Sequence, residues 1–254
     1  MVMGDQMLLN DLRDYNASLL QTSLFKDYCP NGLQVEGRAE VHRIATGVTA
    51  SQHVLDEAIK WGADAILVHH GFFWRNEDPA IVGIKKKRIA QLLGNDVSLL
   101  AYHLPLDAHG ELGNNAQLGR RLGLVAERHF GEQNIVCLGT LIQSQTLTQF
   151  ISRVESELER LPQIVGDGSK IISKVAWCSG GAQSHFEEAI EQGADVYLTG
   201  EISEQSFHLA NESGVGFIAA GHHATERFGI QALGEHLAER FVLEHRFFDQ
   251  ANPV

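Results

Sequence analysis

One segment of the chain occurs in two similar copies, DEAIKWGADAILVHHG (56–71) and EEAIEQGADVYLTGEI (187–202). Glu-Ala-Ile, Gly-Ala-Asp and the following apolar strand coincide without gaps at an offset of 131 residues. The preceding segments HRIATGVTAS (42–51) and SKVAWCSGGA (173–182) share this offset. A third pair, VSLLAYHLPLD (97–107) and GFIAAGHHATE (216–226), follows at an offset of 119. Because self-similarity over such distances indicates a duplicated structural unit, we predict two related lobes.

Each copy is predicted to run strand, helix, strand, helix, strand. Apolar residues recur at helical spacing before Gly62 and Gly193, and glycine commonly ends a helix. The strands AILV and VYL are continuously apolar, which is typical of strands covered on both faces. Alternation of strands and helices therefore predicts an α/β protein with two related lobes, largely parallel sheets covered by helices, and a metal site in the cleft between the lobes.

The lobe boundary is predicted near residue 130, which gives a first lobe of residues 1–130 and a second of 131–254. The C-terminal helix and strand are candidates to pack back on the first lobe. The expected helices, in chain order, are 54–60, 88–93, 114–122, 145–161, 185–191, 205–211 and 224–241, with a terminal strand over 244–249.

The composition narrows the classes of protein that fit. The 254 residues carry a formal charge of −12, so plain binding to a phosphate backbone is disfavoured. The one basic run, Lys85 to Arg88, is interpreted as a solvated helix start. No apolar run approaches the length of a membrane span, so no membrane partner is expected. Three widely separated cysteines fit a reducing compartment, and the cytoplasm is the predicted location.

His69 and His70 stand side by side where the first duplicated strand ends. An imidazole in a buried strand forfeits apolar burial and needs partners for its ring nitrogens, so the pair favours a metal site over a core. Neighbouring side chains diverge on an extended backbone, so the two could serve two different ions. The alternative is a pair of hydrogen-bonded structural histidines.

An imidazole and a carboxylate four residues apart recur at the end of the third strand of each lobe. They are His103 and Asp107 in the first lobe, and His222 and Glu226 in the second. Sites in open α/β sheets collect at the carboxyl ends of strands, so these pairs are expected to join one cleft. Pro105 biases the residue before it toward extended backbone, which predicts a turn for the first pair. Each residue alone has an ordinary structural alternative, and the repeat is what favours the metal interpretation.

The ligand types suit Zn, Mn, Fe or Co, and two carboxylates offset part of the charge of two divalent ions. A carboxylate able to bridge is what a two-metal site needs, with ions roughly 3.5–4 Å apart. Glu201 occupies the position equivalent to His70 and is a candidate acid–base group or a hydrogen-bonded turn residue. The turn Cys178-Ser179-Gly180-Gly181 could cradle a phosphate or only permit tight passage from strand to helix. The run Phe72-Phe73-Trp74 could stack a base or serve packing.

The ordered motifs VHHGFFW, YHLPLDAH, GNN (113–115), LTGEIS and GHHATERFG resemble the interacting-factor-three-like family, whose members are often named GTP cyclohydrolase I type 2. The resemblance runs from Asn31 to the closing NPV. It implies a dinuclear metal site between two α/β lobes and a toroidal homohexamer with the sites facing its interior. The metal ligands carried over by motif are His69, His70, Asp107, His222 and Glu226, with Glu226 as the bridging carboxylate.

The first hypothesis is therefore a metal-dependent hydrolase that acts on a purine nucleotide, with GTP as the implied substrate, or on a phosphoester. A water on two divalent ions would attack, and His103 or Glu201 would move protons. The alternative is a non-enzymatic metal-binding ring, acting as a scaffold or metallochaperone, with a link to DNA damage or stress and with nucleic-acid contact left open. The direction of Lys85 to Arg88, Arg120 and Arg121 is the discriminating observation.

Overall fold

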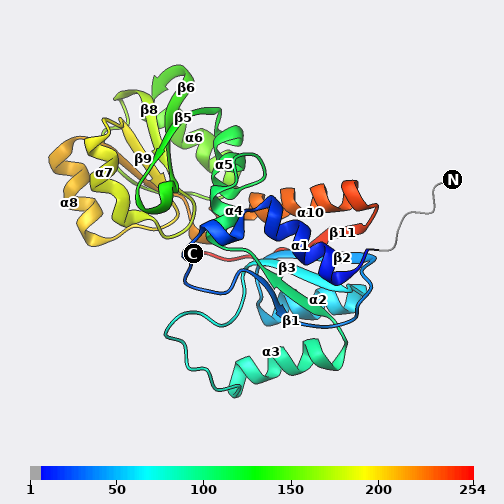
Figure 1. Cartoon of the computed structure of the whole chain (residues 1–254). Coiled ribbons are helices and arrows are strands. Elements are labelled where there is room, and N and C mark those ends of the chain that lie inside the picture. Colours follow the sequence, from blue (N-terminus) through cyan, green and yellow to red (C-terminus); the bar gives the residue numbers. More distant parts are fainter. Residues whose placement is uncertain (1–6) are drawn as a thin grey trace. The chain divides into compact units, whose positions relative to one another are not determined.

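The computed structural model describes residues 7–254, which form two compact units (Figure 1). The first unit runs to Gly113 and also contains Gly229–Ala251, and the second contains Asn114–Phe228 and Asn252–Val254. The sequence placed the boundary at residue 130 instead. The difference arises because the segment after Gly113 supplies a helix and an edge strand to the second sheet. The C-terminal helix and strand do pack back on the first unit.

The first unit is built on a five-stranded sheet of order β1-β4-β3-β2-β11. Parallel pairing joins β4 to β3, β3 to β2 and β2 to β11, and β1 is antiparallel to β4. Its elements are α1 (Leu9–Leu19), η1 (Thr22–Leu24), β1 (Gly32–Val35), β2 (Arg43–Thr49), α2 (Gln52–Trp61), β3 (Ala65–His70), α3 (Gly83–Gly94), β4 (Ser98–Ala101), α4 (Leu104–Ala108), most of α10 (Arg227–Phe241) and β11 (Glu244–Phe247).

The second unit is built on a six-stranded sheet of order β5-β6-β8-β9-β10-β7. Only β8–β9 and β9–β10 pair in parallel there, so this sheet is mixed and not largely parallel. The antiparallel ladders come from β5, β6 and β7, which lie outside the duplicated segments. Its elements are α5 (Asn114–Leu122), β5 (Leu124–Phe130), η2 (Glu132–Asn134), β6 (Val136–Thr146), α6 (Leu147–Leu158), β7 (Gln163–Val165), β8 (Ile171–Trp177), η3 (Gln183–His185), α7 (Phe186–Glu191), β9 (Val196–Thr199), α8 (Glu204–Ser213), β10 (Gly216–Ala219) and α9 (His222–Thr225).

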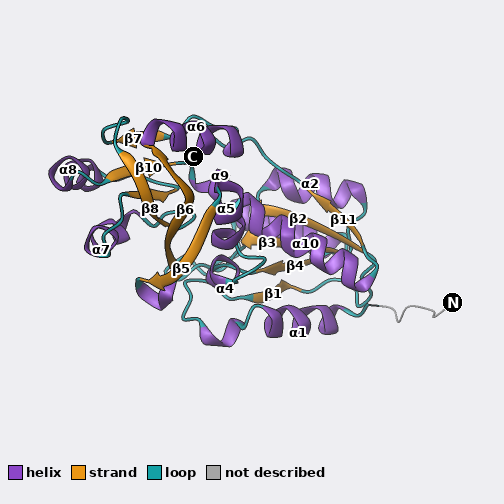
Figure 2. Ribbon diagram, turned by 90° about the horizontal axis from the view of Figure 1, so that it is seen from above, coloured by secondary structure: helices purple, strands orange, loops and turns teal. Residues whose placement is uncertain are grey.

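Both sheets are covered by helices on both faces (Figure 2). In the first unit, α2 and α3 cover one face, and α1 and α10 cover the other. In the second unit, α5 and α6 cover one face, and α7 and α8 cover the other. Successive residues of β3 enter opposite cores, Ile66 on the α2 side and Leu67 on the α1 side. The two-sided burial confirms the prediction drawn from continuously apolar strands.

The duplication is visible in individual hydrogen bonds. Asp64 Oδ2 accepts the backbone N–H groups of His42 and Arg43 at 2.8 and 2.9 Å. Asp195 Oδ2 accepts the N–H groups of Ser173 and Lys174, both at 2.9 Å. In each copy the carboxylate accepts two successive backbone N–H groups, at the start of β2 in the first copy and inside β8 in the second. Gly62 and Gly193, with φ of 85° and 75°, end the helix before each aspartate.

The third strand departs from the predicted alignment by one residue. β3 pairs Ala65 with Ser98, whereas β9 pairs Val196 with Gly216, so the strands correspond at an offset of 118 (216 − 98). The motif offset of 119 holds only from His103 and His222 onward. The second unit therefore has one extra residue between the end of its strand and its histidine. This insertion is accommodated near Gly221, whose φ of 99° favours glycine.

Within residues 7–254, no helix is long and apolar enough to cross a membrane. Cys29, Cys137 and Cys178 are all buried and none forms a disulfide. Burial raises the pKa of the Cys137 thiol to about 12. Burial, together with the nearby charge of Asp27, also raises the pKa of the Cys29 thiol to about 12. These thiols are therefore protonated and poorly reactive near neutral pH.

His245 in β11 predicts a pH-dependent stability. Burial lowers the pKa of this imidazole, and its Nε2 lies 2.8 Å from Thr46 Oγ1. Below the unfolded-state pKa of about 6.5 the unfolded chain takes up a proton that the native ring resists, so this residue makes the free energy of unfolding decrease as the pH falls. We expect the His245→Gln variant to lose less stability than the parent between about pH 7.5 and 5.5, as measured by urea unfolding. A variant whose stability falls as steeply as that of the parent would contradict this.

Candidate metal centre

His69 and His70 lie at the carboxyl end of β3, as predicted. His69 is fully buried, and its Nδ1 lies 2.9 Å from the backbone carbonyl oxygen of Tyr102. That carbonyl requires a donor, so the hydrogen of the His69 ring is on Nδ1. His70 is half-buried, and its Nδ1 lies 3.3 Å from Thr49 Oγ1. Both rings are therefore held through the same nitrogen.

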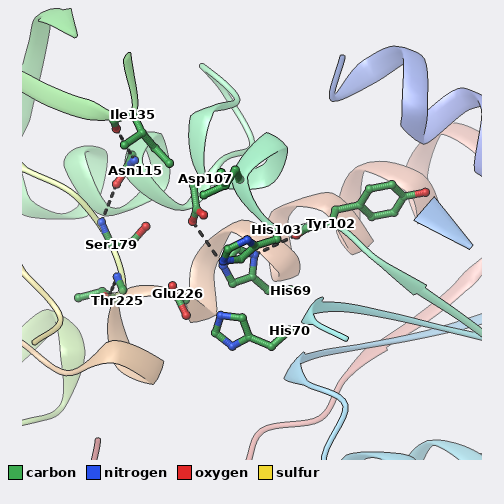
Figure 3. A network of polar contacts seen from close by, with 12 residues as sticks. His69, His70, Tyr102, His103, Asp107, Asn115, Ile135, Ser179, Thr225 and Glu226 are labelled. Atoms are coloured by element: carbon green, nitrogen blue, oxygen red, sulfur yellow. Dashed lines mark hydrogen bonds and ion pairs between the residues drawn. The ribbon is translucent and has the colours of Figure 1, made fainter. Parts of the chain in front are cut away.

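Asp107 lies within the short helix α4, so the predicted turn is wrong. Pro105 occupies the first turn of this helix, where its missing N–H does no harm. The Leu104 N–H, which would otherwise be an unsatisfied donor of the helix start, bonds to Asp27 Oδ2 at 3.0 Å. The helix brings Asp107 Oδ1 to 3.5 Å from His69 Nε2 (Figure 3). The first unit thus places a carboxylate opposite the outward nitrogen of a fixed imidazole.

His103 belongs to the same group of donors. One ring nitrogen from each of His69, His70 and His103 lies within 4.8 Å of the others, which is close enough to hold a metal ion. The His103 Nδ1 is 2.7 Å from Asp27 Oδ1. Because Nδ1 of every ring is engaged inside the unit, Nε2 is the atom that each ring offers to a ligand.

The second unit brings together His222, Glu226 and Glu201. His222 Nδ1 is 2.7 Å from Glu201 Oε1, and its Nε2 is 3.3 Å from Glu226 Oε2. Burial of the ring opposes its protonation, but the two carboxylates outweigh burial and raise the pKa of His222 to about 9. Such a site favours a cation between imidazole and carboxylate, and a divalent metal ion could replace the proton.

The turn Cys178 to Gly181 does not offer a phosphate cradle. Ser179 N–H donates to Asn115 Oδ1 at 2.8 Å, and Gly180 N–H donates to Thr225 Oγ1 at 2.9 Å (Figure 3). The Ala182 N–H donates to Thr199 Oγ1 at 3.2 Å. These donors are used inside the unit, so the structure supports the alternative that the turn permits tight passage. The turn also lies against Glu226, because a Cβ on Gly180 would collide with that carboxylate.

The aromatic run after β3 divides between packing and the site. Phe72 is buried in the core beside α2 and α3, and Phe73 is half-buried against it. The Trp74 ring lies 5.8 Å from that of His70 and 5.0 Å from that of His103, measured between ring centroids. Trp74 therefore contacts two of the imidazoles through its ring.

The basic run lies in α3, and the interpretation as a solvated segment holds for Lys86 and Lys87 but not for the other two, because the Lys85 side chain is only 12% exposed and Arg88 Nε is buried. Lys85 Nζ lies 3.3 Å from a Glu77 carboxylate oxygen, and Lys86 and Lys87 are exposed on α3. Arg121 lies 4.0 Å from Glu157 and stacks over Phe228 at 4.1 Å.

Sequence reasoning missed the residues that hold the ligands. Asp27, Thr49 and the Tyr102 carbonyl anchor three imidazoles in the first unit, and Asn115 and Thr225 fix the turn against Glu226 in the second. A single carboxylate or hydroxyl in a loop leaves no repeating pattern, and a backbone carbonyl leaves none at all. GNN (113–115) was the one available signal, because it was part of the resemblance and contains Asn115.

The fold and these donors define a class, namely α/β proteins of two related units with candidate metal ligands at the carboxyl ends of their strands. The chain matches the family Duf34/NIF3 (NGG1p interacting factor 3) over residues 7–253, and it belongs to that family. This confirms the family inferred from the motifs.

Named relatives cover nearly the whole chain. A "GTP cyclohydrolase 1 type 2 homolog" of Neisseria meningitidis serogroup B is 54% identical over 248 residues, which are 98% of this chain and all of the relative. One of the same name from Escherichia coli K12 is 50% identical over 92% of this chain and 95% of the relative. The solved structure described as "protein ybgI, unknown function" has a TM-score of 0.95 at 47% identity. The match covers 98% of this chain and the whole of that solved chain.

Proposed function

We propose that the protein is a metal-dependent hydrolase with a dinuclear centre whose ions are Zn, Mn, Fe or Co. The proposed ligands are His69, His70, Asp107, His222 and Glu226. The observation that carries the proposal is the orientation of the imidazoles. Each of His69, His70 and His222 is anchored through Nδ1, and both His69 and His222 direct Nε2 at a carboxylate. Metal-binding histidines are typically held in this way by an outer partner.

The donor set fits two divalent ions. Neutral imidazole nitrogens and carboxylate oxygens suit the proposed metals, and two carboxylates offset part of the ionic charge. When bound, such ions lower the pKa of a water and clamp an oxygen of the substrate. We propose Glu226 as the carboxylate shared by both ions. Neither unit alone contains all five ligands, so the proposal requires both.

The proposed substrate is a purine nucleotide or a phosphoester, with GTP as the first compound to test because relatives carry the name "GTP cyclohydrolase 1 type 2 homolog". His103 is proposed as the proton-moving group. Glu201 was the other candidate from the sequence, but its carboxylate holds His222 Nδ1 and also accepts a hydrogen bond from Gln183 Nε2 at 3.3 Å. We therefore propose that Glu201 positions His222.

Self-association into a ring of six chains is part of the proposal. Exposed apolar side chains support self-association as such: Ile81, Val82 and Ile84 are 52, 62 and 68% exposed before and at the start of α3. Contiguous exposed apolar residues commonly mark a surface that another chain covers.

The test is to load the purified protein with Mn, Zn or Fe and to assay GTP and small phosphoesters. We expect Glu226→Gln and His70→Ala to lower turnover by more than the roughly 10–100-fold that loss of an outer-shell partner costs. His208→Ala and Glu187→Gln, which change exposed residues of α8 and α7, are the controls and should retain activity. Turnover that persists in both ligand variants would refute the hydrolase. Bound metal without turnover would favour the scaffold or metallochaperone.

A further inference from the structure

Asp27 has no role in the function proposed above, yet its carboxylate accepts hydrogen bonds from several partners within the first unit. It lies between η1 and β1, and its side chain is only 3% exposed. It accepts four hydrogen bonds, from His103 Nδ1 at 2.7 Å, Asn31 Nδ2 at 2.8 Å, Tyr28 N at 2.6 Å and Leu104 N at 3.0 Å. A buried loop carboxylate with this many partners fixes the positions of the groups that donate to it.

The charge of Asp27 is secured by these partners. Burial alone raises the pKa of a carboxyl group, but the bonds from His103, Asn31 and Tyr28 outweigh burial and lower the pKa of Asp27 to about 2. An ionised carboxylate can only accept hydrogen bonds. The hydrogen between Asp27 and His103 is therefore carried by Nδ1 of the imidazole.

The segment around Asp27 has little freedom to turn. The His103 N–H donates to Asn31 Oδ1 at 2.8 Å, which fixes the amide so that its Nδ2 faces Asp27. Arg75 donates from its backbone N to Tyr28 O at 2.6 Å, and from Nη2 to Asp27 O at 2.7 Å. The Trp74 and Tyr28 rings stand edge-on to the His103 ring, with centroids 5.0 and 6.4 Å away.

We infer that Asp27 is a positioning residue, which holds His103 as the Nδ1–H tautomer with an unprotonated Nε2 turned toward His69 and His70. This Nε2 is then able to accept a proton at the metal centre, whereas the opposite tautomer could only donate. The use of Nε2 rests on the proposed function. The tautomer does not, because every contact that dictates it lies among Asp27, Asn31 and His103.

The Asp27→Asn variant tests this inference, because its amide can take only two orientations, which differ in whether NH₂ replaces Oδ2 or Oδ1. With its NH₂ group in place of Oδ2, it would face two donors, Asn31 Nδ2 and Leu104 N. With NH₂ in place of Oδ1, it would face the Tyr28 N–H and His103 Nδ1, and the imidazole can relieve that contact by moving its hydrogen to Nε2. Since the second orientation leaves fewer donors opposed, the variant is expected to invert the His103 tautomer with little change of shape.

The experiment is ¹⁵N–¹H NMR of full-length protein labelled at histidine, recorded metal-free at about pH 8, above the ordinary imidazole pKa. The His103 signals are identified by their loss in His103→Gln. We expect the parent to show a protonated Nδ1 and a bare Nε2, and Asp27→Asn to show the reverse. Asp64→Asn is the control, because it changes another buried aspartate of the same unit that bonds to Arg38 and two backbone N–H groups. It should leave His103 unchanged.

A parent spectrum with the hydrogen on Nε2, or on both nitrogens, would overturn the inference even if Asp27→Asn failed to fold. An unchanged tautomer in folded Asp27→Asn would also overturn it. Titration with Zn²⁺ supplies the second readout: the His103 Nε2 signal should not move to the position of a coordinated nitrogen, while those of His69 and His70 should. Direct coordination by His103 would refute the role as proton acceptor. If no histidine signal responds to Zn²⁺, the metal proposal fails while the tautomer result stands.

Discussion

Replacement of Gly180 with alanine is expected to weaken metal binding by at least about tenfold, because it displaces the carboxylate of Glu226. A Cβ at this position would collide with Glu226 Oε1 and would lie 3.2 Å from His222 Nε2. The turn is held in place and cannot move away from Glu226, because Gly180 N–H is bonded to Thr225 Oγ1 and Ser179 N–H is bonded to Asn115 Oδ1. The carboxylate is the part that must move, and it is a proposed ligand.

Two control variants separate this collision from other effects of adding a methyl group. Gly214 has a φ of 69°, close to the 67° of Gly180, but a Cβ there would meet nothing within 4 Å. Gly214→Ala therefore reproduces the backbone strain, about 1–2 kcal/mol, without the collision. At Gly181 a Cβ would lie 3.4 Å from the Glu201 carboxyl carbon, an ordinary contact. Calorimetric titration with Zn²⁺ should show weaker binding in Gly180→Ala alone. Equal affinity in Gly180→Ala and Gly214→Ala would contradict the explanation.

The duplicated part of the fold was predictable because its backbone requires the same residue types in both copies. Gly62 and Gly193 end helices in the left-handed region, and each following aspartate bonds to the strand before it. The structure of the segments outside the duplication was harder to predict from the sequence. β5 and β6 form an antiparallel ladder whose pairing depends on contacts remote in sequence, so the lobe boundary was placed too late. The one-residue insertion at Gly221 was hidden by the similarity of the motifs that follow it.

The sequence could identify a group of candidate donors, because imidazoles and carboxylates at strand ends are energetically costly without a partner. The residues and backbone groups that hold these donors in place could not be predicted. The first N–H of α4, that of Leu104, is bonded to Asp27, which lies more than seventy residues earlier in the chain. Pro105 alone suggested a turn. Glu201 was found as a candidate from its place in the repeat, but only the contact with His222 Nδ1 indicates what it does.

The two equivalent aspartates of the repeat, Asp64 and Asp195, are expected to differ in how much each contributes to the free energy of unfolding. Asp64 is buried, with a relative exposure of 6%, and its second oxygen accepts a bond from Arg38 Nη1 at 2.8 Å. Asp195 is only partly buried and accepts the two N–H groups of Ser173 and Lys174. Removal of an acceptor from a buried N–H costs about 1–3 kcal/mol. We therefore expect Asp64→Ala to lower the free energy of unfolding by roughly 2–5 kcal/mol, and Asp195→Ala by a smaller amount, because the Asp64 carboxylate is more deeply buried and also accepts the bond from Arg38.

Asparagine variants test whether Arg38 accounts for part of the difference. In Asp195→Asn, the amide oxygen can keep both backbone bonds, so urea unfolding should give a stability close to that of the parent. In Asp64→Asn the same orientation turns the amide NH₂ toward the Arg38 guanidinium, which removes the ion pair and opposes two donors. A clear loss of stability is expected only there. If the two asparagine variants were equally stable, Arg38 would contribute nothing measurable. The greater cost of Asp64→Ala would then have to come from the deeper burial of the Asp64 side chain alone.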